Sequence, residues 1–131
     1  MLFCHATPRN DSEIFTRQTA EDRLVPVFAG TDEALIVCGH THMQFDRRVG
    51  PKRIVNAGSV GAPFAAPPGA YWLLLGPDVG LRRTDYDFEK AVEQVRATGS
   101  PQSESLVVRY IVMPPTEAET LRTYASAELT S

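Results

Sequence analysis

Short apolar runs, each closed by glycine, proline or polar residues, form the main pattern along this chain. Residues 34–38, Ala-Leu-Ile-Val-Cys, are continuously apolar and rich in branched side chains, which predicts a strand buried on both faces. Residues 1–4 and 70–75 predict two similar strands. Residues 45–49 and 53–55, joined by Gly50-Pro51-Lys52, predict two strands of a hairpin, and residues 80–85 predict an antiparallel partner of the strand at 70–75.

Helical spacing of apolar side chains marks a second set of segments. Residues 88–97 repeat apolar positions every three or four residues, which predicts a helix with one apolar face. Residues 19–28 predict a shorter helix with acidic residues in its first turn. Thr116 and Glu119 have the spacing of a capping box, which predicts a short C-terminal helix. Residues 106–112 leave two alternatives open, a strand or part of a loosely packed tail.

Strands interleaved with helices indicate an α/β fold, and 131 residues are enough for one domain with its own core. The net charge is 13 − 16 = −3 with no basic half, so we expect no nucleic-acid surface. No apolar run approaches the roughly 20 residues that cross a bilayer, so we expect no membrane contact. Two cysteines do not make a disulfide scaffold, which favours a cytoplasmic location.

The three histidines of the chain, His5, His40 and His42, each stand just after a predicted buried strand. If those strands are neighbours, the three imidazoles meet at one sheet edge around a shared cation, because neutral imidazole is the commonest metal ligand. A His-x-His pair in extended backbone would point both rings to the same side. Gly39 would allow a tight turn just before that pair.

Other interpretations of these residues fit the pattern less well. Cys4 and Cys38 could contribute to a zinc site, but their places in apolar runs favour buried, inert thiols. Ser59 lacks the Gly-x-Ser-x-Gly spacing of a nucleophile elbow. A mononuclear cupin-like metal protein could use Asp46, four residues after His42, but it would need a further histidine downstream, and none follows.

Three motifs together resemble a known family. Residues 4–9 (Cys-His-Ala-Thr-Pro-Arg), 37–42 (Val-Cys-Gly-His-Thr-His) and 55–61 (Val-Asn-Ala-Gly-Ser-Val-Gly) occur in the order found in calcineurin-like metallophosphoesterases. The match is to the C-terminal portion of the small bacterial phosphodiesterase branch and covers residues 1–101. Residues 102–131 carry no motif of that family and are expected to be a C-terminal tail with a short helix.

The resemblance implies a four-layer α/β/β/α sandwich with two divalent metal ions, which can be manganese, iron, zinc or nickel. Here the sandwich would be partial, lacking its N-terminal half. By resemblance, His5 and His40 would ligate the second metal and His42 the first. Arg9 and Asn10 would lie near the substrate, and no catalytic residue of the chain can be assigned.

The resemblance also implies a function, namely metal-dependent hydrolysis of a small-molecule phosphodiester or phosphomonoester. The family's Asp-x-His, Gly-Asp and Gly-Asn-His segments are absent here, so the chain alone is expected to have weak or no activity. We expect it to need a missing N-terminal half or to form a homo-oligomer. A non-catalytic interaction module and the cupin-like metal protein are the alternatives.

Overall fold

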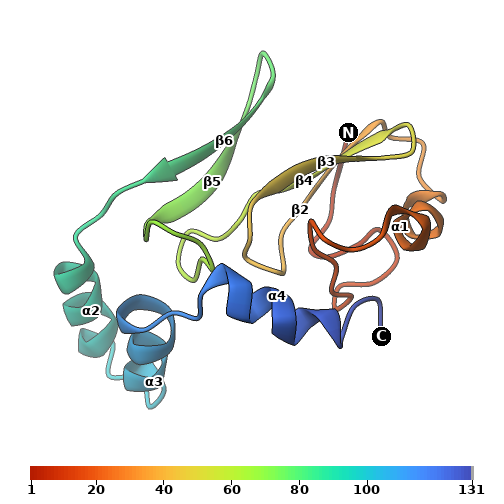
Figure 1. Ribbon diagram of the computed structural model, residues 1–131. Helices are drawn as coiled ribbons and strands as arrows, with labels where there is room; N and C mark the ends of the chain where they lie inside the picture. Colours follow the sequence, from red (N-terminus) through yellow and green to blue (C-terminus); the bar gives the residue numbers. More distant parts are fainter. Residues whose placement is uncertain (131) are drawn as a thin grey trace.

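The computed structural model describes residues 1–130 and contains two sheets and several short helices (Figure 1). In chain order the elements are β1 (Leu2–Phe3), α1 (Glu21–Phe28), β2 (Leu35–Cys38), β3 (Phe45–Val49), β4 (Lys52–Asn56), β5 (Ala70–Leu75), β6 (Val79–Thr84), α2 (Phe88–Ala97), α3 (Ser103–Val107), the π-helical turn η1 (Val108–Val112) and α4 (Glu117–Ala125). The expected α/β fold class is thereby confirmed.

The first sheet has four strands in the order β1-β2-β4-β3. Strands β1, β2 and β4 are parallel, and β3 is the antiparallel partner of β4. The parallel register sets Val37 opposite Val55 and Cys38 opposite Asn56. The carboxyl ends of three strands therefore lie at one sheet edge, where α/β proteins carry their binding groups.

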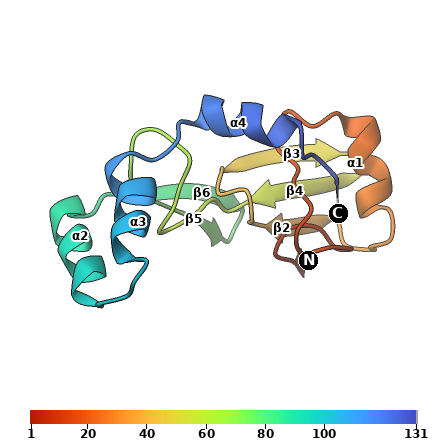
Figure 2. The same ribbon diagram turned by 90° about the horizontal axis from the view of Figure 1, so that it is seen from below.

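The second sheet is the antiparallel hairpin β5–β6, which projects from the first sheet in Figure 1. Figures 1 and 2 place α1 at one end of the molecule and α2 with α3 at the other. Helix α4 runs between these ends alongside the four-stranded sheet. The two sheets are separate, and the hairpin lies beside the four-stranded sheet, on the side toward α2 and α3.

The main core lies between α1 and the four-stranded sheet. Phe15, on the segment before α1, packs edge-on against Phe28 and Phe45 with ring centroids 5.5 and 5.6 Å apart. Leu24 and Ile54 are fully buried in the same cluster. The apolar sequence of β2 and the apolar pair Ile54–Val55 of β4 are therefore explained by their burial inside the sheet and its core.

Residues 106–112 form helix rather than strand, and this corrects the first of the two expected alternatives. Val107 at the end of α3 is fully buried, and Tyr110 of η1 packs against a second small core cluster that contains Phe64. An apolar run of this length fits either state locally, so its packing partners decide the outcome.

The C-terminal helix begins with the predicted capping box. The Thr116 side chain accepts from the Glu119 backbone N–H, and the Glu119 carboxylate accepts from the Thr116 backbone N–H. Beyond α4, the Leu129 N–H donates to the Ile14 carbonyl, so the end of the described chain lies against the segment before α1. The division at residue 101 stays a prediction.

Strand β1 lies at the edge of the four-stranded sheet and leaves apolar side chains exposed. Phe3 is 63% and Met1 60% exposed, high values for large apolar groups next to a core.

Among the helices of residues 1–130, none has the length and apolar character needed to span a membrane.

Candidate metal centre

Parallel pairing of β1 with β2 brings His5 and His40 together. Phe3 lies opposite Val37, and the Gly39 N–H donates to the His5 carbonyl at 2.9 Å, so both chains leave the sheet side by side. His5 Nε2 then lies 3.1 Å from His40 Nδ1, with the rings edge to face at a centroid distance of 4.9 Å. Strand topology alone produces this juxtaposition across 35 residues.

The spacing of these two nitrogens fits two ligands of one ion. At 3.1 Å they are within hydrogen-bonding distance of each other, and they are close enough that both could hold the same divalent ion. Burial, followed by repulsion from His5, lowers the pKa of His40. A lowered pKa favours the neutral imidazole, which is the form that binds metal.

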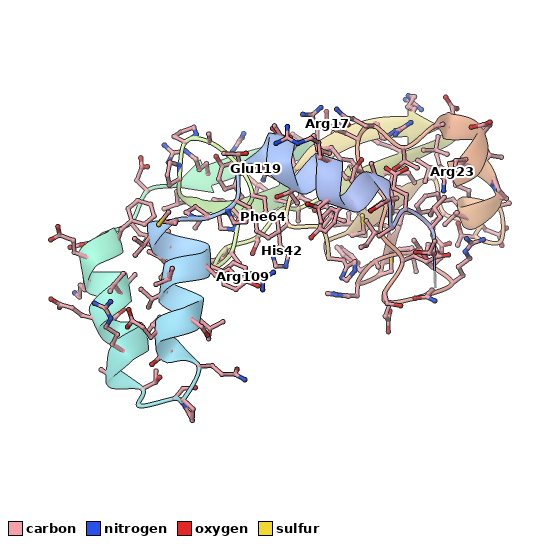
Figure 3. All side chains as sticks on the ribbon, turned by 60° about the horizontal axis from the view of Figure 1, so that its bottom comes forward. Arg17, Arg23, His42, Phe64, Arg109 and Glu119 are labelled. Carbon is pink, nitrogen blue, oxygen red and sulfur yellow. The ribbon has the colours of Figure 1, made fainter. Side chains whose placement is uncertain are left out.

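His42 is oriented separately from the His5–His40 pair. Its Nδ1 lies 2.9 Å from the Ala62 carbonyl oxygen, so Nδ1–H donates there and Nε2 keeps its lone pair. Its ring stacks on Phe64 at a centroid distance of 5.4 Å, where α3 meets the strands (Figure 3). In the described part of the chain no three His, Cys, Asp or Glu side chains surround a single metal position. The structure therefore shows a histidine pair and a third, separate imidazole.

The backbone of the Gly-His-Thr-His loop differs from the expected extended form. His40 and His42 have φ values of 66° and 59°, in the left-handed region that non-glycine residues rarely occupy. Gly39 does not have positive φ, and a Cβ there would meet nothing closer than 3.8 Å. The tight turn thus falls on the histidines themselves, a strained arrangement of the kind that clusters at functional sites.

Asn56, at the carboxyl end of β4, holds this loop in place. Its fully buried side chain donates from Nδ2 to the Gly39 carbonyl at 2.5 Å and to Thr41 Oγ1 at 3.0 Å. Its Oδ1 accepts from the Gly58 N–H at 2.9 Å. Sequence reasoning did not single out Asn56, although a lone amide directly after a buried apolar strand is a recognisable signal.

The loop after Asn56 supports His42. Gly58 has φ of 82°, and a Cβ there would lie 2.7 Å from Cγ of Gln44, so this position needs glycine. Ser59 Oγ accepts from the Ala62 N–H at 3.0 Å and so shapes the turn whose carbonyl binds His42. Ser59 therefore has a positioning contact.

Arg9 and Asn10 lie in the loop after β1 and make contacts within that loop. The Arg9 guanidinium donates to the buried Glu13 carboxylate at 2.6 to 3.0 Å, and Thr7 Oγ1 donates to the same carboxylate at 2.6 Å. Asn10 Oδ1 accepts from Ser12 at 2.7 Å. Their expected proximity to substrate stays a prediction, and the present contacts give both a structural role.

The remaining candidate ligands are committed to other contacts. Cys4 and Cys38 are free thiols, and burial raises the pKa of each, which agrees with inert apolar thiols. The Asp46 carboxylate is paired with Arg53 at 2.6 Å. Together with the three parallel strands of the sheet, this pairing argues against the cupin-like interpretation, which needed that acid beside His42.

Comparison with known proteins gives two kinds of match. The family model described as a calcineurin-like phosphoesterase superfamily domain matches residues 1–75. A metallophosphoesterase of known structure from Sphaerobacter thermophilus is 26% identical, with a TM-score of 0.65 over 82% of this chain and 53% of that one. No curated protein matches this chain.

A second solved structure, a hypothetical protein from Pyrococcus horikoshii, is 18% identical over 81% of this chain and 44% of that one. Its TM-score of 0.67 shows a shared fold. This chain therefore spans about half the length of the solved structures it resembles.

Proposed function

Because this chain belongs to the calcineurin-like phosphoesterase superfamily, whose members hydrolyse phosphoesters with divalent metal ions, we propose that it supplies one side of such a metal centre. His5 and His40 bind one ion together, and His42 binds a second. The observation that carries this proposal is the 3.1 Å separation of His5 Nε2 and His40 Nδ1 at the carboxyl ends of two parallel strands.

The substrate is a small-molecule phosphodiester or phosphomonoester. A bound divalent ion would supply Lewis-acid polarisation of a phosphoryl oxygen and of an attacking water. The contribution of this chain is to present neutral imidazoles in fixed orientation. Burial lowers the pKa of His40 and so favours its neutral form, the Ala62 carbonyl orients His42, and Asn56 holds the loop between them.

On its own the chain binds metal weakly and has little or no activity. Three imidazoles without a carboxylate group nearby are an incomplete set for a two-metal hydrolytic site, and residues 1–130 contain no larger ligand cluster. A further polypeptide segment supplies the remaining ligands by pairing with the β1 edge. The exposed Phe3 of that strand, the exposed Met1 just before it, and the coverage of about half of the solved relatives support this partner. The two free cysteines support a cytoplasmic location.

Titration calorimetry of the full chain with MnCl2, ZnCl2 and NiCl2 tests the proposed pair. His5→Ala and His40→Ala should each abolish the same binding event, while His42→Ala should leave it in place. Wild-type binding by His5→Ala would refute the shared site. No binding of any of these ions at saturating concentration would support a non-catalytic interaction module instead.

Hydrolysis of bis(p-nitrophenyl) phosphate with added Mn²⁺ tests the expected low activity. The wild-type chain should turn over far more slowly than the solved Sphaerobacter metallophosphoesterase measured beside it, with EDTA as the blank. Equal rates would show that the histidines of this chain suffice, and would contradict the need for further ligands.

A further inference from the structure

An apolar groove lies beside His42, between the loop at residues 60–62 and the helices at the far end of the molecule. It consists of two adjoining cavities of about 350 and 370 Å³, which share Gly61, Val95 of α2 and Ile111 of η1. His42 itself lines the first cavity. A ligand held at this imidazole is therefore in direct contact with the groove.

The walls of the groove are suited to an uncharged, flat group. Within the described structure no Lys, Arg, Asp or Glu lines either cavity. Leu106 and Tyr110 line the cavity that contains His42, and Tyr86 lines the other. The volume of each cavity falls at the lower end of the range for small-ligand pockets.

Aromatic rings form a continuous series from the proposed metal side to the groove wall. His42 stacks on Phe64 at 5.4 Å, and Phe64 lies 6.3 Å from Tyr110, with ring planes tilted by 37°. Figure 3 shows His42 and Phe64 at the junction of α3 with the strands. Phe64 is buried and lines neither cavity, so His42, Tyr110 and Tyr86 are the rings that an aryl group in the groove would meet, in offset or edge-to-face contact.

We propose that the groove binds the aryl group of a phosphate ester whose phosphoryl group is held at the imidazoles. This inference rests on the proposed function and specifies its substrate class as aryl esters. A polyphosphate or a second phosphate group is disfavoured in the groove, because the described lining provides no cation to neutralise it.

Gly61 gives a direct test. It lines both cavities, its φ is not in the left-handed region, and a Cβ built there meets nothing within 4 Å. Gly61→Leu should therefore place a side chain in the groove without moving the backbone. Gly30, just after α1, also has open space around its Cβ, so Gly30→Leu is the matched control away from the groove.

The probes are phenylphosphonate and methylphosphonate, titrated into the full chain loaded with Mn²⁺. Withdrawing about 60 Å² of ring surface from water corresponds to about tenfold tighter binding of the phenyl compound. Gly61→Leu should bring this preference close to one, and Gly30→Leu should retain it. Thermal melts of both variants check that each is folded.

The outcomes separate the two proposals. If Mn²⁺ and methylphosphonate bind but the phenyl group adds no affinity, or if Gly61→Leu keeps the preference, the aryl groove is wrong and the metal centre stands. If the wild-type chain binds no Mn²⁺, the proposed function fails and the inference falls with it.

Discussion

Replacement of Asn56 by alanine should weaken both the fold and the proposed metal site. The amide donates to the Gly39 carbonyl and to Thr41 Oγ1, and accepts from the Gly58 N–H. It is the link through which β4 holds the loop that carries His40. Without it, backbone hydrogen bonds such as those from the Gly39 and Thr41 N–H groups remain, but no side chain of β4 holds the left-handed backbone at His40.

The magnitude follows from the hydrogen bonds lost. Each contributes about 0.5–1.5 kcal/mol net, and the partners are left within a buried site, so Asn56→Ala should cost about 3 kcal/mol. For a domain of this size that corresponds to a melting temperature lower by about 10 °C. Because supporting contacts around metal ligands typically affect affinity about 10- to 100-fold, Mn²⁺ binding should weaken at least about tenfold.

Thermal melting by circular dichroism and calorimetric titration with Mn²⁺ measure the two effects. Val49→Ala is the matched control. Val49 is buried in β3, at the end of the β3–β4 pair away from Asn56, and its truncation should lower the free energy of unfolding by about 2–3 kcal/mol. That control should melt earlier yet bind Mn²⁺ like the wild type. Wild-type affinity in Asn56→Ala, or an equal loss of affinity in both variants, would refute a loop-positioning role for the amide.

Three further predictions concern supporting contacts. Gly58→Ala should destabilise the chain by about 1–3 kcal/mol in thermal melts, because the φ of Gly58 is 82° and the new Cβ would lie 2.7 Å from the Gln44 side chain. The control Gly61→Ala should change stability by less than about 0.5 kcal/mol, and equal effects of the two substitutions would contradict this prediction. The Glu128 carboxylate accepts hydrogen bonds from the buried Thr16 and Thr19 and from Arg23, so Glu128→Ala should lower the free energy of unfolding in urea by about 2–3 kcal/mol. The control Glu117→Ala removes an exposed ion pair and should lower it by less than about 1 kcal/mol. Hydrogen bonds from Arg9 are the main cause that lowers the pKa of Glu13 in the folded chain. The stability that this carboxylate contributes is therefore present above the ordinary glutamate pKa of about 4.3, and it is lost as the pH falls through the lower pKa of the folded state. Glu13→Gln should flatten the loss of melting temperature in acid, and a melting temperature that depends on pH as in the wild type would count against this prediction.

The sequence by itself determined the local elements and the family of this protein. The helix predicted at residues 88–97 matches α2 (Phe88–Ala97), and the capping box at Thr116 begins α4. The strand predicted at residues 34–38 became β2 with a one-residue difference at its start. These features depend on side chains within a few positions of one another, so their pattern is readable along the chain.

Only the tertiary structure decided the choices that depend on distant partners. It made residues 106–112 helical, because Val107 and Tyr110 find packing partners there. It paired His5 with His40 through the β1–β2 register, whereas the His42 ring lies apart from them and is hydrogen-bonded to the Ala62 carbonyl. The physical reason is that strand register and loop closure bring together groups that are tens of residues apart. The contacts between such groups exist only in the assembled sheet, so a local sequence pattern does not reveal them.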